Sequence, residues 1–84
     1  MIKKNLATVK IGNINQLHCD YLNKNKGKEP DFMIIDSKVL QNLLDNNEDN
    51  YIIELNYEGK KVYRYGGINI AICDGLKFGE VIFV

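Results

Sequence analysis

The chain is poor in the residues on which catalysis and metal binding most often depend. Its 84 residues include one histidine, His18, and two cysteines, Cys19 and Cys73, which are not spaced as a CxxC pair. Two cysteines are too few for a disulfide scaffold and are typical of a reduced, intracellular protein in which both thiols are buried as small apolar groups. A single histidine leaves metal and triad chemistry little to build on. We therefore expect no metal, no cofactor and no enzymatic activity.

Net charge is also lacking. Eleven Lys and Arg residues balance eleven Asp and Glu residues, and Arg64 is the only arginine. A balanced charge removes the long-range electrostatic field that proteins binding nucleic acids or membrane surfaces usually have. Arginine is the side chain best suited to binding phosphates and bases, so a single arginine points the same way. No apolar run approaches the ~20 residues that span a bilayer, and Met1 begins no signal peptide. The sequence thus argues against nucleic acid and membrane and predicts a soluble cytoplasmic protein.

The apolar residues that are present follow two periods. A period of two predicts strands over residues 6–11, 51–57, 60–65, 68–73 and 80–84. The almost wholly apolar run 31–36 indicates a further strand, covered on both faces. Apolar stripes at helical spacing predict helices over residues 14–24 and 38–45. The order β-α-β-α-β-β-β-β predicts a single α+β domain over residues 1–84, with two helices packed on a mainly antiparallel sheet.

Local signals place the ends of these elements. Asn13 is expected to cap the first helix, Gly27 to follow its end, and Asp36 or Ser37 to cap the second. Dipeptides at 58–59, 66–67 and 74–75 contain the glycine that tight turns need. In the strand 51–57 we expect one side to meet the core and the other to face water.

The chain stops on an apolar segment, residues 80–84. A free C-terminus normally frays, so this segment is either held in a sheet or continues into a longer protein. We expect a paired final strand in which Phe83 is buried.

Three short motifs resemble functional sites but have simpler explanations. The consecutive residues His18, Cys19 and Asp20 would point about 100° apart on a helix and cannot converge, so His18 is expected to pack against the core. The acidic residues 45, 48 and 49 lack the glycine and the final glutamate of an EF-hand loop. The glycines at 66–67 precede a strand and no Lys-Ser/Thr, unlike a phosphate-binding loop.

Tyrosines gather on the expected hairpin 51–65, where cross-strand aromatic pairs stabilise a sheet. Tyrosine beside a lone arginine is also a usual composition of protein interfaces, and basic residues between aromatics occur on single-strand nucleic-acid platforms. The small core leaves little room for all these rings, so we expect some to stay exposed for a protein partner. The candidate interaction residues are Tyr57, Lys60, Lys61, Tyr63, Arg64 and Tyr65.

Residues 30–84 resemble the axial domain of the major capsid protein of tailed bacteriophages. The resemblance lies in a PDFMIID strand leading into a helix capped at Ser37, then a hairpin, YGGINI, a DGL loop and GEVIFV. It implies a non-enzymatic structural domain of a virion that works through contacts with its neighbours, with the hairpin meeting copies of itself head to tail around an axis. A complete capsid subunit is several times longer and carries an arm, a spine helix and a peripheral domain, so the resemblance implies an isolated axial domain or a small relative.

A second hypothesis needs no family. Small neutral α+β proteins of phages and mobile elements often bind and inhibit a host protein, such as a defence or transcription factor, in the host cytoplasm. The abundance of Asn, Lys and Ile fits a low-GC source and both hypotheses. Self-association would favour the capsid-like function, and a monomer would favour the inhibitor.

Overall fold

Helices and strands follow one another in the order that the apolar pattern predicts. A computed structural model describes residues 1–6, 9–46, 51–77 and 79–84. The helices are α1 (Ile11–Lys24) and α2 (Ser37–Asp45). The strands are β1 (Ile2–Asn5), β2 (Phe32–Ile35), β3 (Ile52–Tyr57), β4 (Lys60–Tyr65), β5 (Ile68–Ile72) and β6 (Glu80–Phe83). The α+β class and the element order are thereby confirmed.

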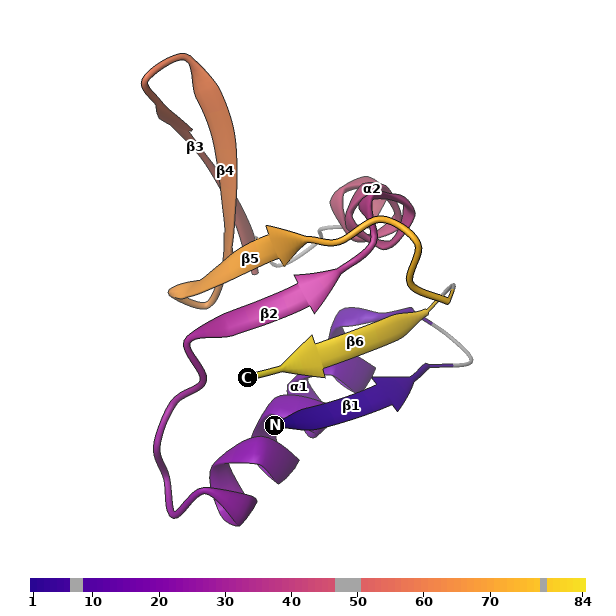
Figure 1. Ribbon diagram of the computed structural model, residues 1–84, viewed down its shortest axis with the longest axis vertical. Helices are drawn as coiled ribbons and strands as arrows, with labels where there is room; N and C mark the ends of the chain where they lie inside the picture. Colours follow the sequence, from indigo (N-terminus) through magenta and orange to yellow (C-terminus); the bar gives the residue numbers. More distant parts are fainter. Residues whose placement is uncertain (7–8, 47–50, 78) are drawn as a thin grey trace.

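All six strands form one sheet in the order β1-β6-β2-β5-β4-β3. Only the pair β2 and β5 is parallel, and the other neighbouring strands are antiparallel. Figure 1 shows both helices behind the sheet and the chain ends side by side on β1 and β6. The molecule is therefore a helix layer on one face of a mostly antiparallel sheet, whose other face has no covering layer among the described residues.

The core lies between the helix layer and the sheet. The helices supply Ile14, Leu17 and Tyr21 from α1 and Val39, Leu40 and Leu43 from α2. Alternate residues of β2 and β6 face them, and Met33, Ile35, Val81 and Phe83 are fully buried. The buried Phe83 and the pairing of β6 with both β1 and β2 confirm the expectation for the final strand.

The expectation that residues 31–36 form a strand covered on both faces is half wrong. β2 does lie inside the sheet, between β5 and β6. However, Phe32 is 45% exposed and Ile34 is half-buried, because both helices pack on the side of Met33 and Ile35. An apolar run indicates a central strand, but it does not say whether a second layer exists.

The first strand lies earlier than the sequence predicts. β1 pairs with β6 over Ile2–Asn5, and β6 begins at Glu80, so the pairing of the two strands stops at Asn5. Leu6 donates one more backbone hydrogen bond to Gly79 (2.8 Å), and Leu6 and Val9 are then buried as the chain turns into α1. Residues 7 and 8 of the expected strand lie outside the described residues.

One of the two predicted helix caps is confirmed and the other is wrong. Asp36 caps α2 as predicted, with its carboxylate accepting from the backbone N–H of Lys38 at 2.7 Å. Asn13 does not cap α1, which begins two residues earlier at Ile11 after Lys10 and has no side-chain cap. Gly12 is tolerated in the first turn of α1, where helical hydrogen bonds are not yet complete. The helix ends at Lys24, near the position expected.

A projecting hairpin as the candidate interaction site

The strands β3 and β4 form a hairpin that stands away from the rest of the sheet (Figure 1). Its register pairs Tyr57 with Lys60 across a two-residue turn. Glu58 and Gly59 have φ values of 51° and 77°, the left-handed pair that matches the twist of a tight hairpin. The predicted turn is thus confirmed, and it places the tip of the hairpin far from the helices.

Only the base of the hairpin is attached to the sheet. β4 pairs with β5 through Arg64 with Asn69 and Tyr65 with Ile68. The accessible surface is 5604 Å², about 500 Å² more than the roughly 5,100 Å² usual for a compact monomer of this mass. A ribbon of two strands without a covering layer accounts for surface of this kind, and such a ribbon is only marginally stable alone.

One face of the ribbon is apolar and exposed. Ile53, Leu55 and Tyr57 of β3 share it with Val62 of β4, and all four are exposed, Tyr57 by 66%. We expected one side of β3 to meet the core, but only Ile52 is buried, because the helices reach no further along the strand. Exposed apolar side chains gathered in this way are typical of a contact surface.

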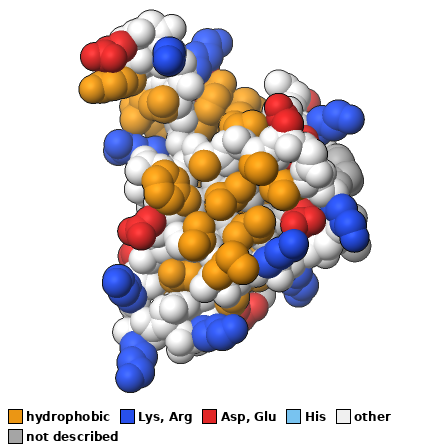
Figure 2. All heavy atoms as spheres, in the orientation of Figure 1, with side chains coloured by type: hydrophobic (Ala, Val, Ile, Leu, Met, Phe, Trp, Pro, Cys, Tyr) orange, Lys and Arg blue, Asp and Glu red, His pale blue; other side chains and the backbone are white. Residues whose placement is uncertain are grey.

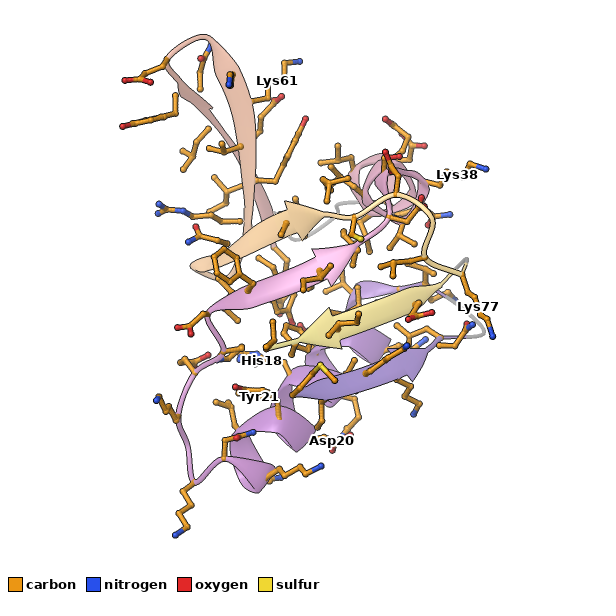
Figure 3. All side chains as sticks on the ribbon, in the orientation of Figure 1. His18, Asp20, Tyr21, Lys38, Lys61 and Lys77 are labelled. Carbon is orange, nitrogen blue, oxygen red and sulfur yellow. The ribbon has the colours of Figure 1, made fainter. Side chains whose placement is uncertain are left out.

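The opposite face of the ribbon is polar. The Glu54 carboxylate accepts from the Lys61 ammonium and from the Tyr63 hydroxyl, each at 3.3 Å. Figure 3 shows Lys61 pointing away from the body near the tip. Because Glu54, Lys61 and Tyr63 bond to one another across the two strands, we take the apolar face as the candidate site.

The structure separates the six candidate residues into three groups. Tyr57, Lys60 and Lys61 are exposed along the outer hairpin, and Arg64 is exposed near its base, where its guanidinium donates to Asn69 at 3.2 Å. Tyr63 is half-buried against the core. The last of the six, Tyr65, is part of the core and offers no ring to a partner.

Tyr65 belongs to an aromatic cluster beneath the base of the hairpin. Its ring is 5.8 Å from that of His18 and 6.0 Å from that of Phe83, and its hydroxyl donates to Asn15. His18 stacks on Phe83 and pairs with Glu29 at 2.8 Å. The packing role expected for His18 is confirmed, and α1 presents its ring to the sheet as in Figure 3.

Because the Tyr65 side chain is buried, we expect the domain to lose stability at high pH. Burial raises the pKa of Tyr65 from 10.0 to about 12, with smaller contributions from Tyr51, Cys19 and Glu29. Between these values the unfolded chain has lost the Tyr65 proton and the folded chain retains it, so stability falls as pH rises. Urea midpoints measured from pH 9 to 12 should fall less steeply in Tyr65→Phe than in wild type. Tyr57→Phe, on an exposed ring, should leave the wild-type slope; equal slopes in all three proteins would contradict this assignment.

The open face of the sheet is also apolar, and the Arg64–Asn69 pair separates it from the ribbon. Phe32, Ile34, Ile82 and Val84 lie on this face and are exposed or half-buried. Figure 2 shows apolar side chains gathered over the middle of the sheet and again on the hairpin. This surface on β2 and β6 was not predicted from the sequence, because an apolar run such as residues 31–36 is also typical of a strand covered on both faces.

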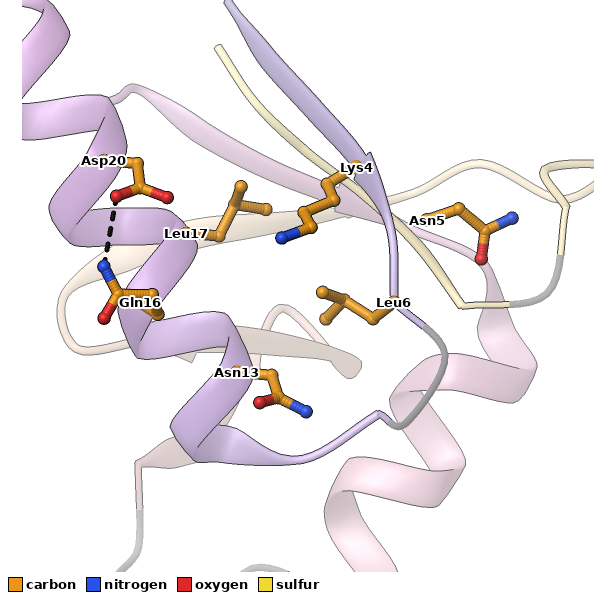
Figure 4. A pocket seen from close by; sticks show the side chains of 7 residues that line it. All are labelled: Lys4, Asn5, Leu6, Asn13, Gln16, Leu17 and Asp20. Atoms are coloured by element: carbon orange, nitrogen blue, oxygen red, sulfur yellow. Dashed lines mark hydrogen bonds between the residues drawn. The ribbon is translucent and has the colours of Figure 1, made fainter.

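A shallow hollow of about 350 Å³ lies between β1 and α1. Figure 4 shows the Lys4 ammonium and the Leu6 side chain pointing into it, while Asp20 accepts a hydrogen bond from Gln16 at 3.1 Å. The hollow brings together one ammonium, one carboxylate and amides, and places no nucleophile beside a base. Its geometry supports no particular reaction.

Two further expectations concern cysteines and metals. Cys19 and Cys73 are both exposed, which corrects the expectation of buried thiols: Cys19 lies on the outer side of α1 and Cys73 follows the end of β5. In the part of the chain that the structure describes, no three His, Cys, Asp or Glu side chains are placed to hold a metal ion. Two of the acidic residues considered as a calcium loop, 48 and 49, lie outside the described residues.

Neither α1 nor α2 is long and apolar enough to cross a membrane, and these are the helices of the described residues.

Comparison of the chain with protein-family models, with curated proteins and with solved structures finds no match. The hairpin and the open sheet face are the features of the molecule that bear on its function.

Proposed function

We propose that this chain is a non-enzymatic interaction domain that acts through protein contacts of its hairpin, in the manner of a phage capsid axial domain meeting its neighbours. The observation that carries the proposal is the apolar face of the ribbon, where Ile53, Leu55, Tyr57 and Val62 are exposed. Apolar side chains cost free energy in water, and a partner that covers them recovers about 25 cal/mol per Å². The formal net charge of zero leaves contact chemistry, and not long-range attraction, to select that partner.

The face can be tested without disturbing the core. Leu55 and Val62 are cross-strand partners on the apolar face, so the double variant Leu55→Thr, Val62→Thr removes apolar area while placing β-branched residues that suit a strand at both positions. We expect association, measured by light scattering over a concentration series, to weaken by roughly tenfold or more. This pair is preferable to Tyr63 with Arg64, because Tyr63 also packs against the core.

Lys61 provides the control, since it is exposed on the polar face and lies on β4, next to Val62. The variant Lys61→Thr should associate as wild type does. If Lys61→Thr weakens association as much as the apolar double variant, the apolar face is not the contact surface. If the wild type is monomeric alone, the capsid-like partner is excluded and a different protein, as in the inhibitor hypothesis, becomes the partner to seek.

A further inference from the structure

Among the described strands, β1 and β3 lie at the edges of the sheet, and they differ in the side chains that protect an edge from pairing. β1, at one edge, has Lys3 and Lys4 among its four residues. Lysine on an edge strand is a common device that prevents pairing with another chain. β3, at the other edge, has the sequence IIELNY, with neither lysine nor proline and with Glu54 as its single charge. The β3 edge is therefore the one that can accept another strand.

The register of the hairpin decides which backbone groups of β3 point outward. Tyr57 and Lys60 flank the two-residue turn and bond to each other, and mutual bonding recurs at every second pair. Leu55 and Ile53 therefore bond inward to β4, whereas the N–H and C=O groups of Glu54 and Asn56 point outward. Within the described residues these outward groups have no hydrogen-bond partner. They form a template for one more antiparallel strand.

We propose that the edge of β3 pairs antiparallel with β3 of a second copy of this chain, about a twofold axis at Leu55. The inference rests on the proposed function for the role of the hairpin as contact surface, and it replaces the head-to-tail contact of a capsid axial domain with a twofold one. The partner is another copy of the chain, and the contact is made by the backbone edges of the two β3 strands. The two six-stranded sheets would then join into one.

The outward backbone groups of β3 allow three registers of antiparallel pairing with the second copy. The positions of the glutamates favour one of these registers. Pairing Glu54 with Glu54 of the second copy, or with Glu58, sets like charges directly opposite each other, which is destabilising. The register centred on Leu55 instead sets Glu54 opposite Asn56 of the second copy. It also aligns Ile53 with Tyr57 and Leu55 with Leu55 on the apolar face. On that face, the pairs between the two β3 strands are then apolar, with Arg64 and Lys60 on the outer β4 strands.

The same geometry limits the assembly to two copies. Once the β3 edges have paired, both ends of the joined sheet are β1 strands with their lysines. The far side of the hairpin is likewise guarded by Lys60 and Lys61 of β4. The contact is small, at the low end of interface sizes, so we expect a dissociation constant in the micromolar range or weaker.

Asn56 offers a test in which association and folding change in opposite directions. Asn56→Glu places a carboxylate opposite Glu54 of the second copy, twice per dimer, but opposite Lys61 within the hairpin. Asn56→Lys reverses both contacts. By sedimentation equilibrium we expect dimer dissociation constants roughly fivefold weaker for the first variant and roughly fivefold tighter for the second. Thermal melts at low concentration should show the opposite order of stability.

Hydrogen exchange gives a second measurement that needs no substitution. The amides of Glu54 and Asn56 should become protected as wild-type concentration rises through the dissociation constant, while the inward amide of Leu55 is protected throughout. Monomers at all concentrations, open-ended aggregates, or equal shifts for both Asn56 variants would each overturn the edge pairing. If Leu55→Thr with Val62→Thr weakens association and the Asn56 variants do not, the proposed function stands and the edge pairing fails. If the Asn56 variants shift association and the apolar pair does not, the edge pairing stands and the apolar face is not what drives the contact.

Discussion

Removal of residues 81–84 is expected to unfold the domain. These residues contain most of β6, which lies between β1 and β2 and is the only pairing partner of β1 among the described strands. The truncation also removes the backbone bonds that Val84 makes with Asp31 and Phe32, at 2.8–3.1 Å. A small domain has roughly 5–15 kcal/mol of stability, and loss of a central strand with a buried Phe exceeds what it can spare. Circular dichroism should show no cooperative melt.

Single substitutions separate the core from the edge of this strand. Phe83→Ala should lower the free energy of unfolding by about 3–5 kcal/mol, since the Phe83 ring is fully buried among His18, Tyr21 and Tyr65. Val84→Ala, at an exposed side chain, should cost under about 1 kcal/mol. A truncated chain that melts at the wild-type temperature would show that β6 does not hold the sheet together.

Gly79→Ala is expected to have the next largest effect on stability. Gly79 has φ +81°, and a Cβ there would lie 2.4 Å from the Leu6 carbonyl oxygen and 3.2 Å from Oδ1 of Asn5. The Leu6 N–H is bonded to the Gly79 carbonyl at 2.8 Å, which holds the two segments close together at the position of the clash. Left-handed strain and the clash together should cost about 2–4 kcal/mol, measured by urea unfolding.

Gly75→Ala is the matched control for this effect. Gly75 has φ +95°, but no atom lies within 4 Å of the position that an alanine Cβ would take, so its substitution carries the backbone strain without the clash. We expect a loss of about 1 kcal/mol. Equal losses at both glycines would mean that the chain between β1 and α1 moves away freely, and that the junction of Leu6 with Gly79 is not rigid.

The elements of this fold follow from local properties of the chain. The stripe from Ile14 to Tyr21 specifies a helix at its own spacing, and the Asp36 side chain caps α2 through a neighbour two residues away. The hairpin turn depends on Gly59 and the residue before it. Periodicity, caps and turns act over a few residues, so the order of elements could be predicted without tertiary information.

The candidate site could be predicted only in part for the same reason. The hairpin was expected as a contact surface, but its apolar face holds Leu55 and Val62, which the sequence did not single out. Tyr57 and Tyr65 are the same residue type, and both lie in strands with a period of two. Their side chains nevertheless differ in exposure, with Tyr65 3% exposed and Tyr57 66% exposed. Their burial depends on where α1 and β5 end relative to the hairpin, and no local pattern encodes that.

The sequence by itself determined the two helices, the strands from β2 to β6, the order of elements and the turn of the hairpin, because these result from interactions between residues close along the chain. The position of β1 depended on its pairing with the distant β6. Tertiary structure alone decided that both helices lie on one face, that β2 has an open side, and that β3 is an unprotected edge. Those properties arise from contacts between distant segments, such as β1 with β6 and β2 with β5. An apolar residue is specified as apolar by the sequence, but whether it becomes core or contact surface is set by the layer that covers it.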